Sequence, residues 1–357
     1  MGYYAEGYKA MGAGLEASGR PIEYSCSWPA YAGANESTKP FQTYIDDGCN
    51  GWRNFNDVQC HWGSVSSIID HWGMYGEALQ PWAGPGHWHD MDMLLVGAIS
   101  LGYDPHGPGT GERCISLVEE QTQMAIWSIS SSPLIMGNDM RNVSADSKAI
   151  LFNQNAIAVN QDPLGKMGIR LTGDAPSQVW AKTLTPSAGA AFKAAVGLYN
   201  KYAGGQPLPT SGCSAWSKTG GSFYDSPFTV GAFPNGTTLA EAEAACCAND
   251  QCAGFSFSLA KGGFYKGQPL GALRPAPGAY DGYARPGSVP GSGPAPAQET
   301  DIAFKFANIP GWPADADASA AVTVLDIWTG KMTTVTTGEY TAKGVPVHGT
   351  AFITIEV

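Results

Sequence analysis

The chain has 357 residues, enough for one large domain with an ordinary hydrophobic core and a smaller domain beside it. Its 31 acidic against 20 basic residues give a formal net charge of -11, which argues against binding to a nucleic-acid backbone. Charged residues make up 14% and aromatic residues 11%. That combination is typical of proteins that handle neutral ring-shaped ligands such as sugars, and equally of a well-packed aromatic core.

The first 19 residues are expected to form an amphipathic helix, because apolar side chains recur at helical spacing and Gly19 follows as a C-terminal stop. The segment lacks the basic start and apolar stretch of a signal peptide. We therefore expect the chain to lack the N-terminal part of the protein. The apolar positions are Tyr4, Tyr8, Met11 and Leu15.

From residue 1 to about 170, short apolar runs alternate with helical patterns, which is the rhythm of a parallel α/β fold. Helices are expected over 64–75 and 116–129, the second with a capping box from Ser116 to Glu119. In parallel α/β barrels the chemistry lies just after the strands. The strand candidates are 21–26, 52–57, 91–96 and 133–136.

After residue 170 the pattern changes to short alternating strands, over 171–203 and again over 299–357. These two pieces are expected to form one antiparallel β domain. Between them, residues 204–298 begin and end with Gly- and Pro-rich runs and are interpreted as an inserted module with flexible joints.

Eight cysteines, with Cys246, Cys247 and Cys252 close together, indicate a disulfide framework and a secretory route, lysosomal or extracellular. No apolar run is long enough to span a bilayer. Glycosylation acceptor triplets agree with this route. They begin at Asn35, Asn142 and Asn235.

Asp57, at the end of the run 52–58, is the first candidate for chemistry. Cleavage of a glycosidic bond with retention needs two carboxyl groups about 5 Å apart, one attacking and one protonating the leaving oxygen. Asp57 suits the second role if the strand end keeps it partly dry and so raises its pKa. Arg53 can hold a sugar hydroxyl. The alternative is an ordinary surface pair between Arg53 and Asp57.

A metal site is the other chemical reading of the run 87–93, since His87, His89, Asp90 and Asp92 lie close together. Alternation on a strand, however, would send the two histidines to one face and the two aspartates to the other. We therefore expect neither a metal nor another cofactor.

Several segments, in order, resemble glycoside hydrolase family 27, the α-galactosidases and α-N-acetylgalactosaminidases. The resemblance implies the C-terminal half of a (β/α)8 barrel, about strands 5 to 8, over residues 1–170, followed by the β domain. The segments are GYKAMGAGLEASGRPIEYSCSWPAY, CNGWRNFNDV, LQPWAGPGHWHDMDMLLVG, QTQMAIWSISSSPLIMGNDMR and AIAVNQDPLGKMG.

The resemblance implies a role for each matching residue. It makes Asp57 the general acid/base and Arg53 a sugar ligand near the 2-position, and it places Asp92 and Met93 near the sugar pocket. Where His89 and Met91 stand, family members usually have Asn and Pro. The resemblance also pairs Cys26 with Cys49 and assigns no partner to Cys60 or Cys114.

The resemblance also implies which sugar is preferred. Galactose-specific animal members carry Glu and Leu where this chain has Ser27 and Ala30, and N-acetylgalactosamine-specific members carry Ser and Ala. Small residues leave room for an N-acetyl group, whose methyl can touch Ala30 and whose carbonyl can bond to the Ser27 hydroxyl. Tyr31, in the same loop, is also expected to line the pocket.

The family nucleophile is an Asp in a Lys-x-Asp-x-Cys strand motif, expected upstream of this chain. Asp47 imitates its ending but lacks the Lys, so we reject it. By this expectation, residues 1–357 do not catalyse the reaction alone. The alternative function is a catalytically dead sugar-binding or adhesion protein on the same fold, and a metal hydrolase using His87 and His89 is a third.

The insert resembles an apple or PAN-type module, with a cysteine-bearing helix and a following Cys-x-Gly-Phe-x-Phe strand. The glycosidase resemblance implies terminal α-galactosyl or α-N-acetylgalactosaminyl glycans as partners. Because modules of the apple or PAN type commonly bind proteins or glycans, the insert is expected to hold a glycan or a protein and so keep the enzyme near its substrate. A disulfide-stapled loop without a binding role is the alternative. A homodimer is a further possibility that the sequence leaves open.

Overall fold

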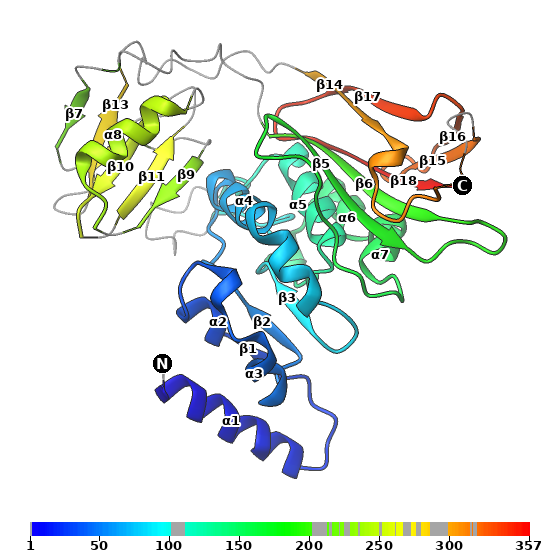
Figure 1. Ribbon diagram of the computed structural model, residues 1–357, viewed down its shortest axis with the longest axis horizontal. Helices are drawn as coiled ribbons and strands as arrows, with labels where there is room; N and C mark the ends of the chain where they lie inside the picture. Colours follow the sequence, from blue (N-terminus) through cyan, green and yellow to red (C-terminus); the bar gives the residue numbers. More distant parts are fainter. Residues whose placement is uncertain are drawn as a thin grey trace. The chain divides into compact units, whose positions relative to one another are not determined.

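A computed structural model of the chain shows a mixed α/β architecture followed by antiparallel sheets (Figure 1). No helix among the described residues is long and apolar enough to cross a membrane. The structure describes residues 2–100, 111–201, 213, 216–220, 222–224, 229–234, 236–249, 252–260, 262–266, 273–275, 280–285, 299–314, 316 and 320–357.

The helices and strands have the following bounds. The helices are α1 Gly2–Ala17, α2 Trp28–Tyr31, α3 Phe41–Asp46, α4 Trp62–Leu79, α5 Leu117–Ile129, α6 Ala145–Leu151, α7 Gln154–Asn160 and α8 Leu239–Ala248, with short 3-10 turns at Glu36–Thr38, Gln80–Trp82, Met140–Asn142 and Phe306–Asn308. The strands are β1 Ser25–Cys26, β2 Gly51–Arg53, β3 Trp88–Asp90, β4 Ile169–Arg170, β5 Ser177–Leu184, β6 Lys193–Asn200, β7 Ser217–Thr219, β8 Ser222–Tyr224, β9 Thr229–Phe233, β10 Gly254–Ser258, β11 Gly262–Lys266, β12 Leu273–Pro275, β13 Asp281–Ala284, β14 Thr300–Lys305, β15 Val322–Asp326, β16 Met332–Val335, β17 Glu339–Val345 and β18 Thr350–Glu356.

The chain divides into two compact units. The first contains residues 1–60, 68–201 and 300–357, so it holds the α/β part together with the C-terminal sheets. The second contains residues 61–67 and 202–299.

A parallel sheet, in the order β1-β2-β3, forms the centre of the α/β part. Its third strand covers Trp88–Asp90, whereas the sequence placed it at 91–96; from that range only Leu94 makes a parallel bridge, to Met136. The shift has a physical reason, because Asp92 takes a left-handed backbone conformation with φ of 78°, which no regular strand contains. The strand expected at 133–136 is likewise reduced to this bridge.

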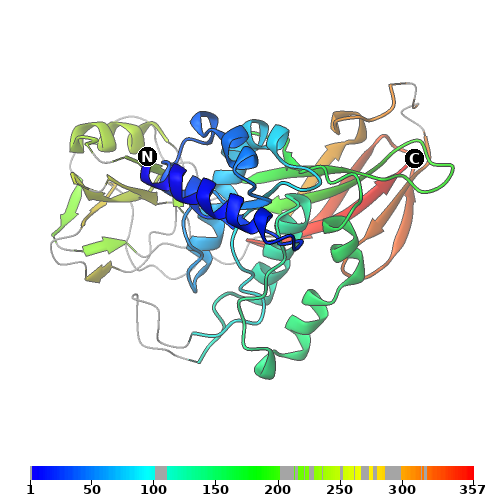
Figure 2. The same ribbon diagram turned by 90° about the horizontal axis from the view of Figure 1, so that it is seen from below.

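Helix α1 is a long single helix, drawn in dark blue beside the N-terminus in Figure 2. Its Tyr8 ring stacks on Trp28 of α2 at 5.8 Å. Gly12 permits a close approach, since a Cβ there would lie 1.9 Å from the carbonyl oxygen of Asp47. The predicted stop is present, with Gly19 at φ of 66° just after the helix.

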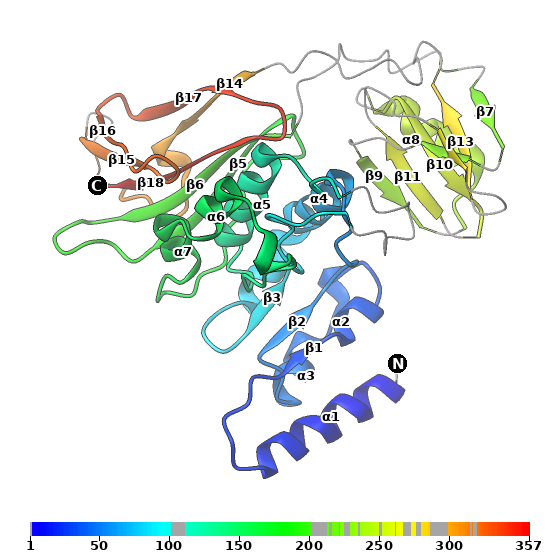
Figure 3. The ribbon, with the colours of Figure 1, turned by 180° about the vertical axis from the view of Figure 1, so that it is seen from behind.

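A second, antiparallel sheet has the order β16-β15-β18-β6-β5-β4, with β14 and β17 paired beside it. Strand β18 pairs with β6 along its whole length, so residues before and after the insert share this sheet. Helices α5, α6 and α7 lie on one face of it (Figure 3), and Ile129 of α5 fits against Gly197 of β6. Buried Lys182 of β5 donates to the carbonyl oxygens of Val159 at 2.6 Å and Asn160 at 3.2 Å, which joins the sheet to the end of α7.

The second unit contains the sheet β7-β13-β10-β11-β9 with α8 beside it. Two disulfides, Cys213–Cys247 and Cys246–Cys252, fasten α8. The buried Arg285 guanidinium donates to carbonyl oxygens at the end of that helix, which a cation stabilises. Phe255 and Tyr283 stack at 5.0 Å in the core of this unit. The acceptor Asn235 lies outside the described residues.

Candidate active site

The parallel strands bring the predicted site residues to one edge of the sheet. Cys26 pairs with Trp52, and Arg53 pairs with Asp90. The residues that follow the three strands therefore emerge together at their carboxyl ends. Ser27 is the first residue after β1, and Asp57 lies four residues after β2.

The centre of this edge is an arginine shared by two carboxylates. The Arg53 Nη2 atom lies 2.9 Å from Asp57 Oδ1 and 2.7 Å from Asp92 Oδ2. The side chain of Asp57 is 81% exposed, that of Arg53 18% and that of Asp92 7%. A single guanidinium thus orients an open carboxylate above a buried one.

The exposure of Asp57 corrects one expectation. The sequence interpretation required the strand end to keep this carboxyl partly dry, and the structure leaves it in solvent. The reason is local, because Asn54 turns inward while Asn56 and Asp57 turn outward after the strand has ended at Arg53. In this chain Asp57 is therefore oriented by charge, through Arg53, and is not desolvated.

Asp92 connects the two segments of the site. Its carboxylate accepts from the backbone N–H groups of Val58 and Met93, each at 2.7 Å, in addition to Arg53. Its positive φ makes it one of the few non-glycine residues here in the left-handed region, which short acidic side chains tolerate best. Such strain at a cluster of charged groups is typical of functional sites.

Asp90 lies beneath this cluster and is buried. Burial raises the pKa of its carboxyl, and the charge of Asp92 adds to the effect, although the Asp92 backbone N–H and the nearby Arg53 act in the opposite direction. Its Oδ1 atom accepts from the Asp92 backbone N–H at 2.8 Å, so it supports the turn that carries Asp92.

A buried polar network holds Asn54, which lies between Arg53 and the exposed residues Asn56 and Asp57. Asn54 is buried; its Nδ2 donates to Glu36 Oε2 at 3.0 Å and its carbonyl oxygen accepts from Lys39 Nζ at 2.7 Å. Glu36 Oε1 also accepts from Lys39 Nζ and from His71 Nε2, both at 2.7 Å. Phe55 stacks on His71 with ring centroids 3.9 Å apart. We call Glu36, Lys39, Asn54 and His71 the Glu36 network.

The Glu36 network keeps its charges despite burial. Desolvation by itself raises the pKa of Glu36, but the hydrogen bonds from His71, Lys39 and Asn54 outweigh it and hold the pKa below its ordinary value. The pKa of His71 is lowered by burial, so a neutral imidazole that donates to Glu36 fits the geometry.

The contacts of His89 bear on the metal site considered for the run 87–93. This residue is buried, and its Nδ1 accepts from Trp52 Nε1 at 2.8 Å while its Nε2 donates to the Leu79 carbonyl oxygen at 2.9 Å. Both ring nitrogens are thus used inside the core. Burial lowers its pKa to about 4. Among the described residues no group of three metal-type ligands comes together.

The loop predicted to select the sugar follows β1 directly. Ser27 is exposed at the start of α2, and its backbone N–H donates to the Tyr8 hydroxyl at 3.2 Å. Ala30 is half-buried. Tyr31 is 63% exposed and stacks on Tyr4 at 5.4 Å. Met93, after β3, is 44% exposed.

Two disulfides flank the site. Cys26–Cys49, which the resemblance implied, joins the end of β1 to a residue two positions before the start of β2. Cys60–Cys114, for which the sequence offered no pairing, ties the segment after Asp57 to the one before α5. Asp47 precedes β2, so it lies toward the amino end of the strand whose carboxyl end carries Asp57.

Sequence reasoning missed the residues that support the site. The Glu36 network was not recognised, although Asn54 lies inside the run 52–58; an amide between Arg53 and Phe55 was the only available signal in the sequence. Polar residues on the buried face of α5 were missed as well. Those are Glu120, Gln123 and the Trp127 indole.

The comparison with protein families gives one match in this part of the chain. The profile of the melibiase family described as "Alpha galactosidase A" matches residues 2–162. These residues include β1, β2 and β3 and every predicted site residue.

Relatives match the same part of the chain. The α-N-acetylgalactosaminidase of Gallus gallus is 41% identical over 187 residues, which are 52% of this chain and 42% of that protein. The α-galactosidase A of Homo sapiens is 39% identical over 181 residues, 51% of this chain and 38% of that protein. The chain thus spans about two-fifths of the length of the curated relatives it matches.

Among solved structures, α-galactosidase I from Mortierella vinacea matches with a TM-score of 0.57 and 19% identity. The match covers 98% of this chain and 62% of that one. At this identity the likeness concerns the fold alone.

Proposed function

We propose, from the match of residues 2–162 to the family model described as "Alpha galactosidase A", that the protein containing this chain is a retaining exo-acting glycoside hydrolase. Its substrates would be glycoconjugates that end in α-linked N-acetylgalactosamine or galactose. The names of the relatives support this, since those at about 40% identity are α-N-acetylgalactosaminidases and an α-galactosidase.

The Arg53–Asp57–Asp92 cluster is the observation that carries the proposal. In it Asp57 acts as the general acid, donating its proton to the leaving glycosidic oxygen and recovering one from water in the second step. Arg53 lies 2.9 Å from Asp57. In this proposal its remaining N–H donors bind the sugar hydroxyls. Asp92 and Met93 line the pocket beside it. The attacking carboxylate stays unassigned within residues 1–357, because Asp47 lies toward the other end of β2.

The proposed preference is for N-acetylgalactosamine. Ser27 is exposed and Ala30 half-buried on the loop after β1, so both can face a 2-substituent that Arg53 approaches from the next strand. A hydroxyl and a methyl-sized contact suit an acetamido group, and a pocket built to bond such a group rejects a sugar that lacks it. The four disulfides of the described residues agree with a secretory route.

Hydrolysis of paired chromogenic α-N-acetylgalactosaminide and α-galactoside substrates by the full-length protein tests the proposal. We expect the first to be cleaved with the higher kcat/KM, and a strong preference for the galactoside would refute the roles of Ser27 and Ala30. The Asp57→Asn variant keeps the shape but lacks the proton, so we expect turnover to fall by at least about 100-fold with sugar binding retained. Unchanged turnover in that variant would refute the role of Asp57.

A further inference from the structure

The segment that carries Asp92 and Met93 is held by the side chains of a helix that follows it in sequence. The carbonyl oxygen of Asp92 accepts from Trp127 Nε1 at 2.7 Å. Gln123 makes two bonds, donating from Nε2 to the Met93 carbonyl oxygen at 3.2 Å and accepting at Oε1 from the Leu95 backbone N–H at 2.8 Å. In a regular strand these backbone groups would bond to the backbone of a neighbouring strand instead.

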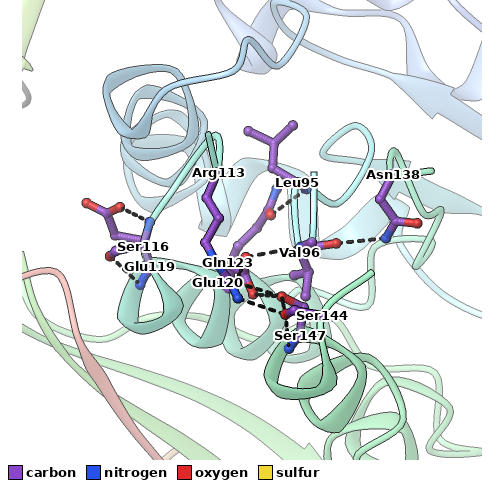
Figure 4. Close-up of polar contacts among 11 residues, drawn as sticks. Leu95, Val96, Arg113, Ser116, Glu119, Glu120, Gln123, Asn138, Ser144 and Ser147 are labelled. Carbon is purple, nitrogen blue, oxygen red and sulfur yellow. Dashed lines mark hydrogen bonds and ion pairs between the residues drawn. The ribbon is translucent and has the colours of Figure 1, made fainter. Parts of the chain in front are cut away.

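The supporting residues belong to one face of α5. Glu120, Gln123 and Trp127 follow helical spacing, and each is fully buried. Glu120 accepts from the Gly97 backbone N–H at 3.1 Å, which extends the contact to the end of the segment. Figure 4 shows Gln123 bonded to Leu95 and Glu120 surrounded by its donors.

The charge of Glu120 is balanced within the same cluster. Arg113 Nη1 donates to its Oε1 at 2.9 Å, and the Ser147 hydroxyl donates to its Oε2 at 2.7 Å (Figure 4). The face is therefore a satisfied polar surface, and satisfied buried networks favour a single arrangement. It bonds to the backbone of the segment 92–97 at four residues, Asp92, Met93, Leu95 and Gly97.

We propose that Gln123 is a positioning residue for the sugar pocket, acting through the backbone of Met93 and Leu95; this rests on the proposed glycosidase function. Met93 has an unbranched and half-exposed side chain, so its place in the pocket depends on where its backbone is held. The Gln123 amide donates to the Met93 carbonyl and accepts from the Leu95 N–H at once, which neither an apolar side chain nor a carboxylate can do. Asp92, next in the chain, then presents its carboxylate to Arg53.

The test compares two isosteric variants of neighbouring residues in the full-length protein that contains this chain. Gln123→Met removes both bonds to the segment. Thr122→Val is the matched control, because the buried Thr122 hydroxyl donates to the His348 carbonyl oxygen, away from 92–97. Each variant loses hydrogen bonds made by a buried side chain of α5, so both are expected to lower the midpoint of unfolding.

Two readouts separate positioning from stability. With p-nitrophenyl α-N-acetylgalactosaminide we expect kcat/KM to fall on the order of 100-fold in Gln123→Met and less than about twofold in Thr122→Val. The second readout is amide hydrogen exchange. We expect the Leu95 N–H to exchange about tenfold faster in Gln123→Met but not in Thr122→Val. Equal losses of kcat/KM in both variants, or an unchanged Leu95 exchange rate, overturn the inference.

A third variant covers the case in which Gln123→Met does not fold. In Gln123→Glu the protonated acid can donate and accept as the amide does, whereas the carboxylate cannot donate. Its kcat/KM relative to the unmodified chain should therefore rise as pH falls, and a flat ratio counts against the inference. An unmodified protein that cleaves neither chromogenic substrate refutes the proposed function, while Leu95 exchange still decides the placement by Gln123.

Discussion

Replacing Glu36 by Gln should destabilise the protein far more than replacing a surface acid. Glu36 and Lys39 have side chains that are fully buried, and their charged atoms lie 2.7 Å apart. Gln removes the negative charge and leaves the buried Lys39 ammonium with neutral acceptors alone, among them the Asn54 carbonyl oxygen. Breaking a buried pair from one side costs about 3–5 kcal/mol, because an uncompensated charge stays in the interior. We expect a loss of that size in the free energy of unfolding.

Urea unfolding followed by tryptophan fluorescence measures this loss, and a double variant identifies its cause. Adding Lys39→Met to Glu36→Gln removes the orphaned charge, so we expect at least half of the lost stability to return. The control is Asp139→Asn, which breaks an exposed pair with Arg141 and should change the midpoint little. A loss below about 1 kcal/mol for Glu36→Gln, or no recovery in the double variant, would refute an ionised Glu36–Lys39 pair.

Two further predictions concern pH and covalent structure. Burial lowers the pKa of His89 from 6.5 to about 4, so the unfolded chain takes up its proton first; stability is therefore lost as pH falls from 7 toward 4, by about 2 kcal/mol at pH 5. Urea unfolding at pH 7 and pH 5 should show a smaller difference in His89→Asn, and an equal difference would contradict the assignment. Separately, the Cys60–Cys114 disulfide closes a loop of 54 residues, so replacing both cysteines by Ala should cost up to about 4 kcal/mol in the same assay. An unchanged midpoint of urea unfolding would show that the disulfide constrains neither the folded nor the unfolded chain.

Local signals explain what the sequence could predict. The capping box from Ser116 to Glu119 is present as expected, because both of its partners lie within one turn. The extent of the strands was harder, since a parallel strand is defined by its neighbours; the third strand ends at Asp90, before the apolar run that had suggested it. The Cys26–Cys49 bridge came from a family resemblance, and Cys60–Cys114 had no local signal.

The candidate site, like the fold, could be predicted from the sequence only in part. Its charged members could be named from one run of sequence and a resemblance, but their supports could not. Glu36 lies 18 residues before Asn54 and 35 before His71, and nothing in their separate surroundings joins them. A buried amide or acid reads as an ordinary surface residue until the fold brings its partners together.

The Glu36 network and the polar face of α5 both act on the site through Asp92. Together they explain how the exposed carboxylate of Asp57 can be oriented. The Glu36 network fixes Asn54 at the start of the loop that follows Arg53, and the face of α5 fixes the segment that carries Asp92. An exposed carboxylate such as Asp57 gains little order from a single surface ion pair. Its partner Arg53, however, is held at 2.7 Å by the buried Asp92, whose carboxylate also accepts from the Val58 N–H next to Asp57. A displacement on either side therefore reaches Asp57 through Asp92, so the direction of the proposed proton transfer depends on residues that never touch the sugar.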